Sequence, residues 1–291
     1  MTEAGAHASY HGPIIDAHVH LFPERMLQAV IAFFERHGFS MPHRKPAEEL
    51  VADLAGHGVV AYTLLNYVRQ PGQAESLNAW TVEFAASHPE AIPFGTVHLG
   101  DPDPLVTIAP YLDRLMGLKI QPLVSEFGLD APRLDPVLAR LEEQDKILIT
   151  HSGTAPYANE WVGLDRLETV LRRHPRLRVV CAHMGAYEID RALRMLDEFE
   201  NLFLDTAVMF VRAEMFPKCP VPPAETWSRY EDRIMFGSDF PLIAYPYDKA
   251  LESISRLPLS DTGRKKIYYE NAARLFGWVR PVVAREVACS K

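Results

Sequence analysis

Short apolar runs alternate with longer amphipathic segments along most of this chain. Eight runs of mainly apolar, β-rich residues are bounded mostly by Gly, Pro, Asp or Asn, as buried strands are; they lie at 14–17, 59–65, 92–97, 118–120, 147–149, 179–182, 202–204 and 234–236. Between most of them, apolar residues recur at steps of three and four, which predicts helices at 46–58, 74–89, 134–144, 164–175 and 187–199. Several of these segments end in Gly or His-Pro, which are helix stop signals.

Eight strands that alternate with helices predict a parallel sheet with helical connections. Within about 250 residues this pattern favours an α/β fold formed by a single (β/α)8 TIM barrel. A doubly wound open sheet is the alternative, but it would normally carry a Gly-rich phosphate loop after an early strand, and the sequence has none. We expect a lead-in at 1–13, the barrel at 14–280 and a C-terminal tail at 281–291.

The composition narrows the class of protein. Hydrophobic residues make up 48% and charged residues 23%, a globular balance with enough material for a large core. The net charge of −8, without a Lys/Arg-rich run, argues against a nucleic-acid partner. No stretch approaches the ~18 apolar residues of a membrane span, and residues 1–13 lack the basic and apolar regions of a signal peptide.

Cysteine usage points to a reducing compartment. Three cysteines without close pairing fit the cytoplasm and exclude a cysteine-type zinc site. We therefore expect a cytoplasmic protein with a small-molecule substrate and no nucleic-acid or membrane partner. A homodimer stays open.

Polar side chains follow four of the predicted strands. His18 and His20 stand at the end of the first run, and residues i and i+2 of a strand point to the same face. His151, His183 and Asp239 end the fifth, sixth and eighth runs. Their separations are close to four, one and two βα units of about 31 residues, so all five would surround one mouth of the barrel. Imidazole and carboxylate groups are the ligands that Zn²⁺ and similar ions prefer.

The other histidines lack such a pattern. A single histidine is usually a surface residue or a core residue with its hydrogen bonds satisfied. Two of the remaining histidines, His88 and His174, precede Pro at predicted helix ends, where the helix dipole favours a histidine. One ends the third predicted strand but stands in no comparable motif. We interpret these six as structural or surface residues: His37, His43, His57, His88, His98 and His174.

With these residues laid out, the chain resembles the amidohydrolase superfamily. The resemblance is to the amidohydrolase-related branch that includes aminocarboxymuconate-semialdehyde decarboxylase, and it covers nearly the whole chain. The motif HxH alone is weak evidence, but HxH followed in order by the later His and Asp motifs is specific. The motifs are IDAHVH (15–20), GLKIQP (117–122), THSG (150–153), AHMG (182–185), FGSDFP (236–241) and NAARLFG (271–277).

The resemblance implies a barrel with one divalent ion, usually zinc. By motif position its ligands would be His18, His20, His151 and Asp239. His183 would be left near the metal-bound water as a general acid/base, and Asp239 could share that water's proton. The chemistry agrees, because bound zinc brings the pKa of water to near 7 and a nearby histidine suits proton transfer.

Lys119 leaves the number of metals open. Other amidohydrolases use a carboxylated lysine on strand 4 to bridge two metals, whereas single-metal enzymes of this branch carry similar GxK-like motifs. We interpret Lys119 as structural or substrate-facing, with a binuclear site as the alternative.

The resemblance also leaves two reactions open. Members of this branch hydrolyse amides, lactones and esters, or remove CO₂ from unsaturated or aromatic acids. We predict a metal-dependent hydrolase of a small carboxylated substrate, with a decarboxylase as the alternative. A barrel that binds without turnover is disfavoured, because pure binding needs neither an open metal position nor a proton carrier. Two arginines would suit a carboxylated substrate, and the candidate substrate-binding residues are Asn66, Arg69, Lys119, Tyr157, Tyr187 and Arg212.

Overall fold

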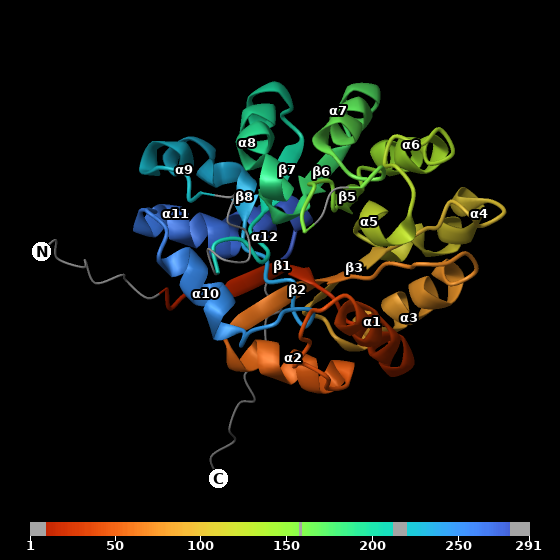
Figure 1. Ribbon diagram of the computed structural model, residues 1–291, viewed down its shortest axis with the longest axis horizontal. Coiled ribbons are helices and arrows are strands. Elements are labelled where there is room, and N and C mark those ends of the chain that lie inside the picture. The colour runs from red at the N-terminus through yellow and green to blue at the C-terminus, as the bar shows by residue number, and fades with distance from the viewer. Residues whose placement is uncertain (1–9, 157–158, 212–219, 280–291) are drawn as a thin grey trace, which may run out of the picture.

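Eight parallel strands form one sheet whose spatial order follows the chain, and helices surround it (Figure 1). The structure is a computed structural model, and it describes residues 10–156, 159–211 and 220–279. The strands are β1 (Ile14–Val19), β2 (Val59–Leu65), β3 (Ala91–Gly95), β4 (Gly117–Ile120), β5 (Ile147–Thr150), β6 (Arg178–Cys181), β7 (Leu202–Asp205) and β8 (Ile234–Met235). All eight strands predicted from the apolar runs are present, and the predicted (β/α)8 barrel is confirmed.

Helices connect the strands on the outside of the sheet (Figure 1). The α-helices are α1 (Glu24–Arg36), α2 (Ala47–Gly56), α3 (Ala74–Ser87), α4 (Pro104–Ile108), α5 (Pro122–Ser125), α6 (Asp135–Glu143), α7 (Leu164–Arg173), α8 (Ile189–Glu198), α9 (Ala224–Tyr230), α10 (Asp248–Ser255), α11 (Asp261–Lys265) and α12 (Asn271–Phe276). Short 3₁₀ or π segments are η1 (Ala109–Arg114), η2 (Ala182–Glu188), η3 (Glu231–Arg233) and η4 (Lys266–Glu270). The five predicted helical segments correspond to α2, α3, α6, α7 and α8.

Backbone hydrogen bonds between β1 and the segment after β8 close the barrel. The Ala17 N–H donates to the Phe236 carbonyl at 2.9 Å, and the His20 N–H donates to the Phe240 carbonyl at 2.7 Å. The Asp239 N–H donates to the His18 carbonyl at 2.8 Å. Closure therefore brings the first and the last of the predicted chemical motifs against each other.

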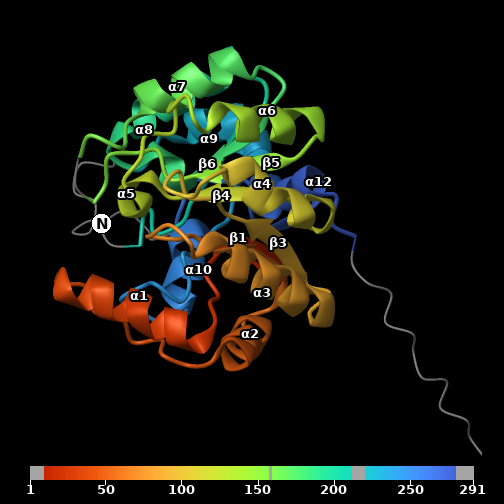
Figure 2. The same cartoon turned by 90° about the vertical axis from the view of Figure 1, so that its right-hand side faces the viewer.

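The two ends of the barrel are built differently. At the end where the strands begin, the Leu275 carbonyl of α12 accepts a hydrogen bond from Arg178, the first residue of β6, and Phe276 packs edge-on against Phe94 of β3. At the opposite end, where the strands finish, lie α1 and α5 (Figure 2). Apolar side chains fill the interior between the ends, so the polar strand-end residues gather at one mouth.

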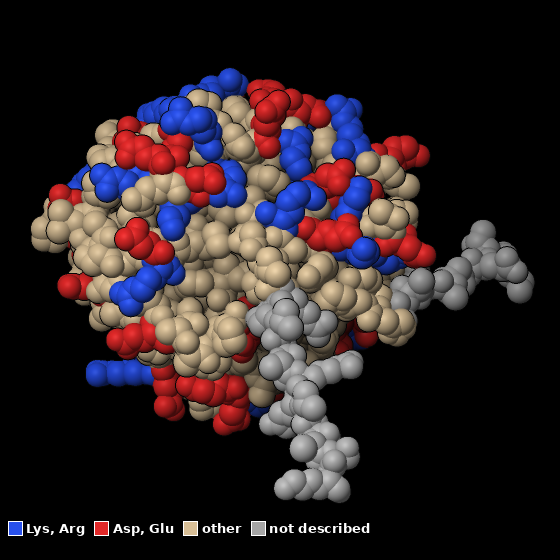
Figure 3. All heavy atoms as spheres, turned by 180° about the vertical axis from the view of Figure 1, so that it is seen from behind, with Lys and Arg blue, Asp and Glu red and all other residues tan. Residues whose placement is uncertain are grey.

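Neither the described helices nor the face drawn in Figure 3 shows a feature typical of a membrane or nucleic-acid partner. Among the described helices, none is both long and apolar enough to cross a membrane. On the face drawn in Figure 3, which is opposite to that of Figure 1, basic and acidic side chains are interspersed and neither sign forms a continuous area.

Candidate metal centre

Three side chains converge at the mouth of the barrel with their ligand atoms almost in contact. His18 Nε2 lies 3.2 Å from His20 Nε2, and Asp239 Oδ1 lies 2.9 Å from His20 Nε2 and 3.3 Å from His18 Nε2. Metal–ligand bonds of about 2.0–2.1 Å in a tetrahedron place neighbouring ligand atoms roughly 3.3 Å apart. The three atoms therefore have the spacing that one divalent ion requires.

The hydrogen bonds at Nδ1 of the two histidines turn the Nε2 atom of each towards Asp239. His18 Nδ1 donates to the Asp205 carboxylate at 2.8 Å, and His20 Nδ1 donates to the Leu65 carbonyl at 2.5 Å. Since both acceptors need a proton on Nδ1, each neutral imidazole carries its lone pair on Nε2. Both lone pairs point into the group that includes Asp239, as metal ligands do when a second hydrogen bond orients the ring.

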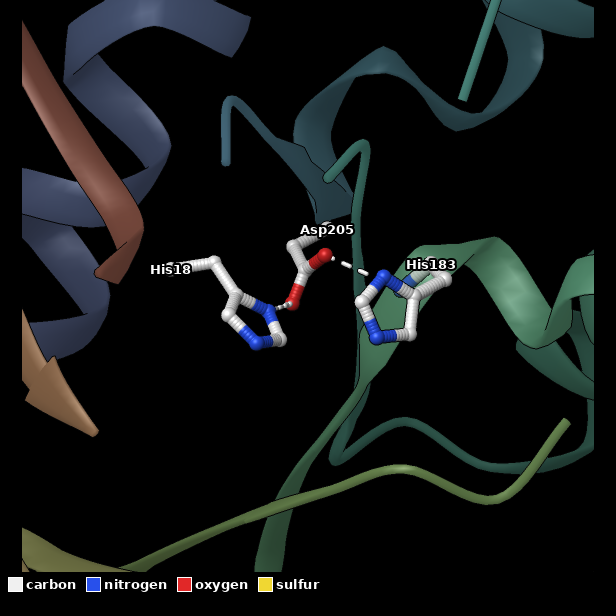
Figure 4. A group of neighbouring side chains, drawn as sticks. All are labelled: His18, His183 and Asp205. Carbon is white, nitrogen blue, oxygen red and sulfur yellow. Dashed lines mark hydrogen bonds and ion pairs between the residues drawn. The ribbon is translucent and has the colours of Figure 1, made fainter. Parts of the chain in front are cut away.

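Asp205, the last residue of β7, connects His18 with His183 (Figure 4). One carboxylate oxygen accepts from His18 Nδ1, and the other accepts from the backbone N–H groups of His183 at 3.0 Å and Ala207 at 3.1 Å. Burial raises the pKa of Asp205, and the nearby His183 and the two backbone hydrogen bonds oppose that effect. His18, His183 and Asp205 could themselves hold an ion, but their closest atoms already bond within the protein. His18, His20 and Asp239 are therefore the better candidate group for a metal ion.

Asp16 fixes the two segments that carry the ligands. Its Oδ1 accepts from the His18 N–H at 3.1 Å and from the Ser238 N–H at 3.0 Å, while its Oδ2 accepts from the Tyr247 hydroxyl at 2.8 Å. Burial raises the pKa of Asp16 to about 7. This carboxyl group ties β1 to the segment after β8, and so it holds His18 and Asp239 in register.

His183 stands in a turn of unusual backbone geometry. In η2, four successive residues from His183 to Ala186 have φ values of 56°, 49°, 73° and 49°. Left-handed backbone is costly for residues other than glycine, and such strain concentrates at functional sites. The turn packs so closely on the loop after β5 that a Cβ at Gly153 would lie 2.3 Å from the Gly185 carbonyl oxygen. Position 153, in the motif THSG, therefore requires glycine, because the backbone of the motif AHMG leaves no room for a side chain there.

The His183 ring is a neutral proton acceptor. Its Nδ1 donates to the Ala207 carbonyl at 3.1 Å, which leaves the lone pair on Nε2. Burial, followed by the neighbouring His18, lowers the pKa of His183 to about 4. The rings of His18 and His151 lie 4.9 and 4.8 Å away, centroid to centroid. His183 is therefore beside the proposed metal position and neutral near pH 7.

His151 belongs to the same histidine cluster but not to the close group of ligand atoms. Among the described residues, it is absent from both sets of His and Asp side chains whose ligand atoms lie within 4.8 Å of one another. Its Nε2 donates to the Ala155 carbonyl at 2.8 Å, and its Nδ1 is buried without a hydrogen-bond partner in the described chain. Burial, then His183 and Lys119, lowers its pKa to about 3. The free lone pair on Nδ1 fits a role toward a bound ion or ligand.

Lys119, on β4, is fully buried and lies against the metal position. Its Nζ is 3.3 Å from His18 Nε2, and burial lowers its pKa to about 8. An ammonium group there points at the lone pair that a metal would use. Lys119 does not line the cavity described next.

A cavity of about 130 Å³ opens beside His20 and Asp239, two of the three converging residues, and we name it the metal chamber. Its lining includes His20, His151, His183 and Asp239, and the rest of its wall is mostly apolar. The walls come from α1 and the following segment (Phe33, Phe34, His37, Phe39, Met41), from Tyr67, from the region of α5 (Gln121, Leu123, Val124), and from Ala155, Pro156, Ala186, Val208, Leu242, Ile243 and Ala244.

The other predicted substrate-binding residues lie in different places. Asn66 is fully buried and donates to the Thr81 hydroxyl at 2.8 Å, away from the chamber lining. Arg69 is exposed and lies in a neighbouring cavity. Tyr187 is half-buried in η2 and does not line the chamber. Tyr157 and Arg212 lie outside the described residues.

Several residues of the site are absent from the sequence prediction. Asp205 ends β7 just as the predicted residues end their strands, so its signal was present in the sequence. Tyr67 packs edge-on against His20, with ring centroids 5.2 Å apart, and Gln121 directly follows β4. His37, interpreted as a surface residue, lines the metal chamber. Phe33 and Phe34 gave no signal, because α1 reaches the chamber only in the folded barrel.

A family model described as "Amidohydrolase" matches residues 15–278. The chain belongs to the amidohydrolase family. The family resemblance inferred from the motifs is thereby confirmed, and the protein is a member of a family of enzymes. A search of curated proteins found no match.

Several solved structures have the same fold as this amidohydrolase, although their sequence identity to it is low. An uncharacterised TIM-barrel protein from Bordetella bronchiseptica is 20% identical, with a TM-score of 0.72, and the match covers 91% of this chain and 99% of that one. A 5-carboxyvanillate decarboxylase from Novosphingobium aromaticivorans, complexed with manganese and 4-hydroxy-3-methoxy-5-nitrobenzoic acid, is 19% identical, with a TM-score of 0.64 and coverage of 94% and 98%. A 2,6-dihydroxybenzoate decarboxylase from Rhizobium is also 19% identical, with a TM-score of 0.64 and coverage of 91% and 98%.

Proposed function

We propose that this amidohydrolase is a metal-dependent enzyme that removes CO₂ from a small aromatic or unsaturated carboxylic acid. Hydrolysis of a small lactone, ester or amide is the second candidate. The observation that carries the proposal is the convergence of His18, His20 and Asp239 beside a largely apolar chamber, which His20 and Asp239 line. We expect one ion per chain, with zinc as the first choice for these nitrogen and oxygen ligands. The manganese of the N. aromaticivorans decarboxylase makes Mn²⁺ the alternative.

The chamber walls favour decarboxylation over the hydrolysis that the sequence first suggested. Apolar walls remove water from a carboxylate, which disfavours the charged acid relative to neutral CO₂ and the product. No Lys or Arg side chain lines the chamber in the described part of the chain. Among the described residues, a carboxylate in the chamber would therefore find its cationic partners only at the metal position, where Lys119 also lies.

Each residue of the centre has a distinct part in this proposal. His18, His20 and Asp239 would hold the ion, with His151 Nδ1 as the candidate fourth ligand. The ion, when bound, would polarise an oxygen of the substrate. During CO₂ loss the carbon–carboxyl bond breaks, its electron pair stays on the substrate carbon, and that carbon takes up a proton from solvent. His183 Nε2 is positioned to relay the proton, and Asp239 could share it.

A specific observation keeps hydrolysis as the second candidate. His183 is neutral near pH 7 and has a free Nε2 at the chamber wall. Such a group can accept a proton from an attacking water molecule as readily as it can relay one to carbon. The two reactions differ in their products, and the measurement below separates them.

The test is a substrate panel on protein loaded with zinc or manganese. Hydroxybenzoic, cinnamic and dienoic acids would be followed by CO₂ release, and five- and six-membered lactones by acid release. We expect CO₂ from at least one class of acid and its loss in Asp239→Asn. Acid release from lactones without CO₂ would replace decarboxylation by hydrolysis, and inactivity towards every compound would count against both.

A further inference from the structure

A second cavity adjoins the metal chamber and differs from it in charge. It has a volume of about 210 Å³, and Phe33, Phe34, Tyr67 and Val124 line both spaces. We name the second cavity the outer groove. Four polar side chains line it in addition to the shared residues: Arg36, Arg69, Gln70 and Gln73. The two cavities are therefore neighbours that share a partly aromatic wall.

The guanidinium groups of the outer groove lack an acidic partner. Neither Arg36 nor Arg69 has a carboxylate within 4.0 Å among the described residues, whereas Arg44, a few residues after α1, pairs with Glu35. The Arg69 guanidinium lies 4.9 Å from the centroid of the Phe33 ring. This cation–π contact holds one positive charge against the shared wall.

We propose that the outer groove binds a second anionic group of the substrate, at the end remote from the metal. The substrate class is then an elongated dicarboxylic acid with an apolar body, which fills the chamber with its body and reaches Arg36 and Arg69 with its distal carboxylate. Arginine suits this task because its planar fork of N–H donors matches a carboxylate. This inference rests on the proposed function only for the position of the first carboxylate.

Calorimetric binding to zinc-loaded protein tests the inference without turnover. The probes are two rigid pairs: benzoate with benzene-1,4-dicarboxylate, and biphenyl-4-carboxylate with biphenyl-4,4′-dicarboxylate. We expect the dicarboxylate of at least one pair to bind about tenfold more tightly than its monocarboxylate, as one exposed charge-assisted contact allows. This ratio should fall towards one in the Arg36→Gln/Arg69→Gln variant and persist in Arg69→Lys. In the wild type, the affinity ratio should also decrease when the salt concentration is raised from about 20 to about 500 mM.

Arg25→Gln is the matched control, because Arg25 is exposed on the same helix as Arg36 but does not line the outer groove. It should leave the ratio unchanged. A ratio near one for both pairs, no binding by any probe, a ratio that survives the double substitution, or an equal loss in Arg25→Gln would each overturn the inference. A preserved dicarboxylate preference without CO₂ release from any acid would instead reject the proposed reaction and leave the outer groove standing.

Discussion

Asp205 Oδ2 accepts a hydrogen bond from His18 Nδ1 at 2.8 Å, while its other oxygen accepts one from the His183 backbone N–H at 3.0 Å. The first bond fixes the tautomer of a proposed metal ligand, and the second fixes the turn that carries the proposed proton carrier. A single buried carboxylate thus sets the geometry of both. It joins two histidines that lie far apart in the sequence.

Asp205→Asn should weaken zinc binding about 10–100-fold, because an amide can donate to Nδ1 and favour the wrong tautomer of His18. Competition with a chromophoric chelator measures the affinity. Asp165→Asn, a change at an exposed carboxylate of α7, is the control and should leave the affinity unchanged. Equal zinc affinity in wild type and Asp205→Asn would show that His18 needs no such orientation.

Metal analysis should find about one divalent ion per chain in protein reconstituted with zinc, because the two candidate groups among the described residues share His18, and in the second group His18 and Asp205 already bond to each other. His18→Ala and Asp239→Ala should lose both the ion and activity. Removal of the ion with a chelator should lower the melting temperature, since a ligand of the native state stabilises it. Two ions per chain would instead indicate a carboxylated Lys119 that bridges them, and zinc retention by Asp239→Ala would remove Asp239 from the centre.

His183→Asn should keep near-normal zinc content while turnover of a substrate from the panel falls by roughly 10²–10⁴-fold, the usual contribution of general acid–base catalysis. The reason is that His183 Nδ1 bonds to the Ala207 carbonyl and its ring stands beside the ligand group, not within it. Zinc analysis and steady-state kinetics on one preparation separate the two effects. Loss of zinc would make His183 a ligand, and unchanged turnover would assign the proton to another group.

The metal-free protein should lose stability as the pH falls from about 7 towards 4. His18, His151 and His183 have lowered pKa values in the folded state, so they are neutral there but protonated in the unfolded chain below their ordinary pKa of 6.5. Unfolding then takes up protons, and each histidine adds at most about 1.4 kcal/mol per pH unit to the decline. Urea unfolding at pH 7, 6 and 5 in the presence of a chelator measures the free energy.

Two variants check the origin of this slope. His183→Asn removes one titrating group, so its free energy of unfolding should fall less steeply between pH 6 and 5. Asp16 acts in the opposite direction, because its raised pKa of about 7 makes the folded protein bind a proton that the unfolded chain has released. The free energy of unfolding of Asp16→Asn should therefore fall more steeply with decreasing pH than that of the wild type. Identical slopes in all three proteins would contradict the assignment.

The order and kind of the structural elements follow from local sequence, and the prediction succeeded there. A strand or an amphipathic helix needs only a periodic run of apolar residues and a stop signal, both of which lie within a few consecutive residues. The runs at 59–65 and 147–149 thus correspond to β2 and β5 within one residue. The barrel also places every strand end at one mouth, so the motifs alone identified His18, His20, His183 and Asp239 as neighbours.

The finer arrangement depends on the closed barrel, because it joins atoms that are distant along the chain. Backbone bonds between β1 and the segment after β8 decide that His20 and Asp239 meet at 2.9 Å, and the loop carbonyl of Ala155 decides which nitrogen of His151 stays free. In the same way, the aromatic side chains of α1 become chamber walls only where that helix lies over the mouth. Local periodicity can predict which strand a residue ends, but hydrogen-bond partners and cavity walls arise from packing between elements.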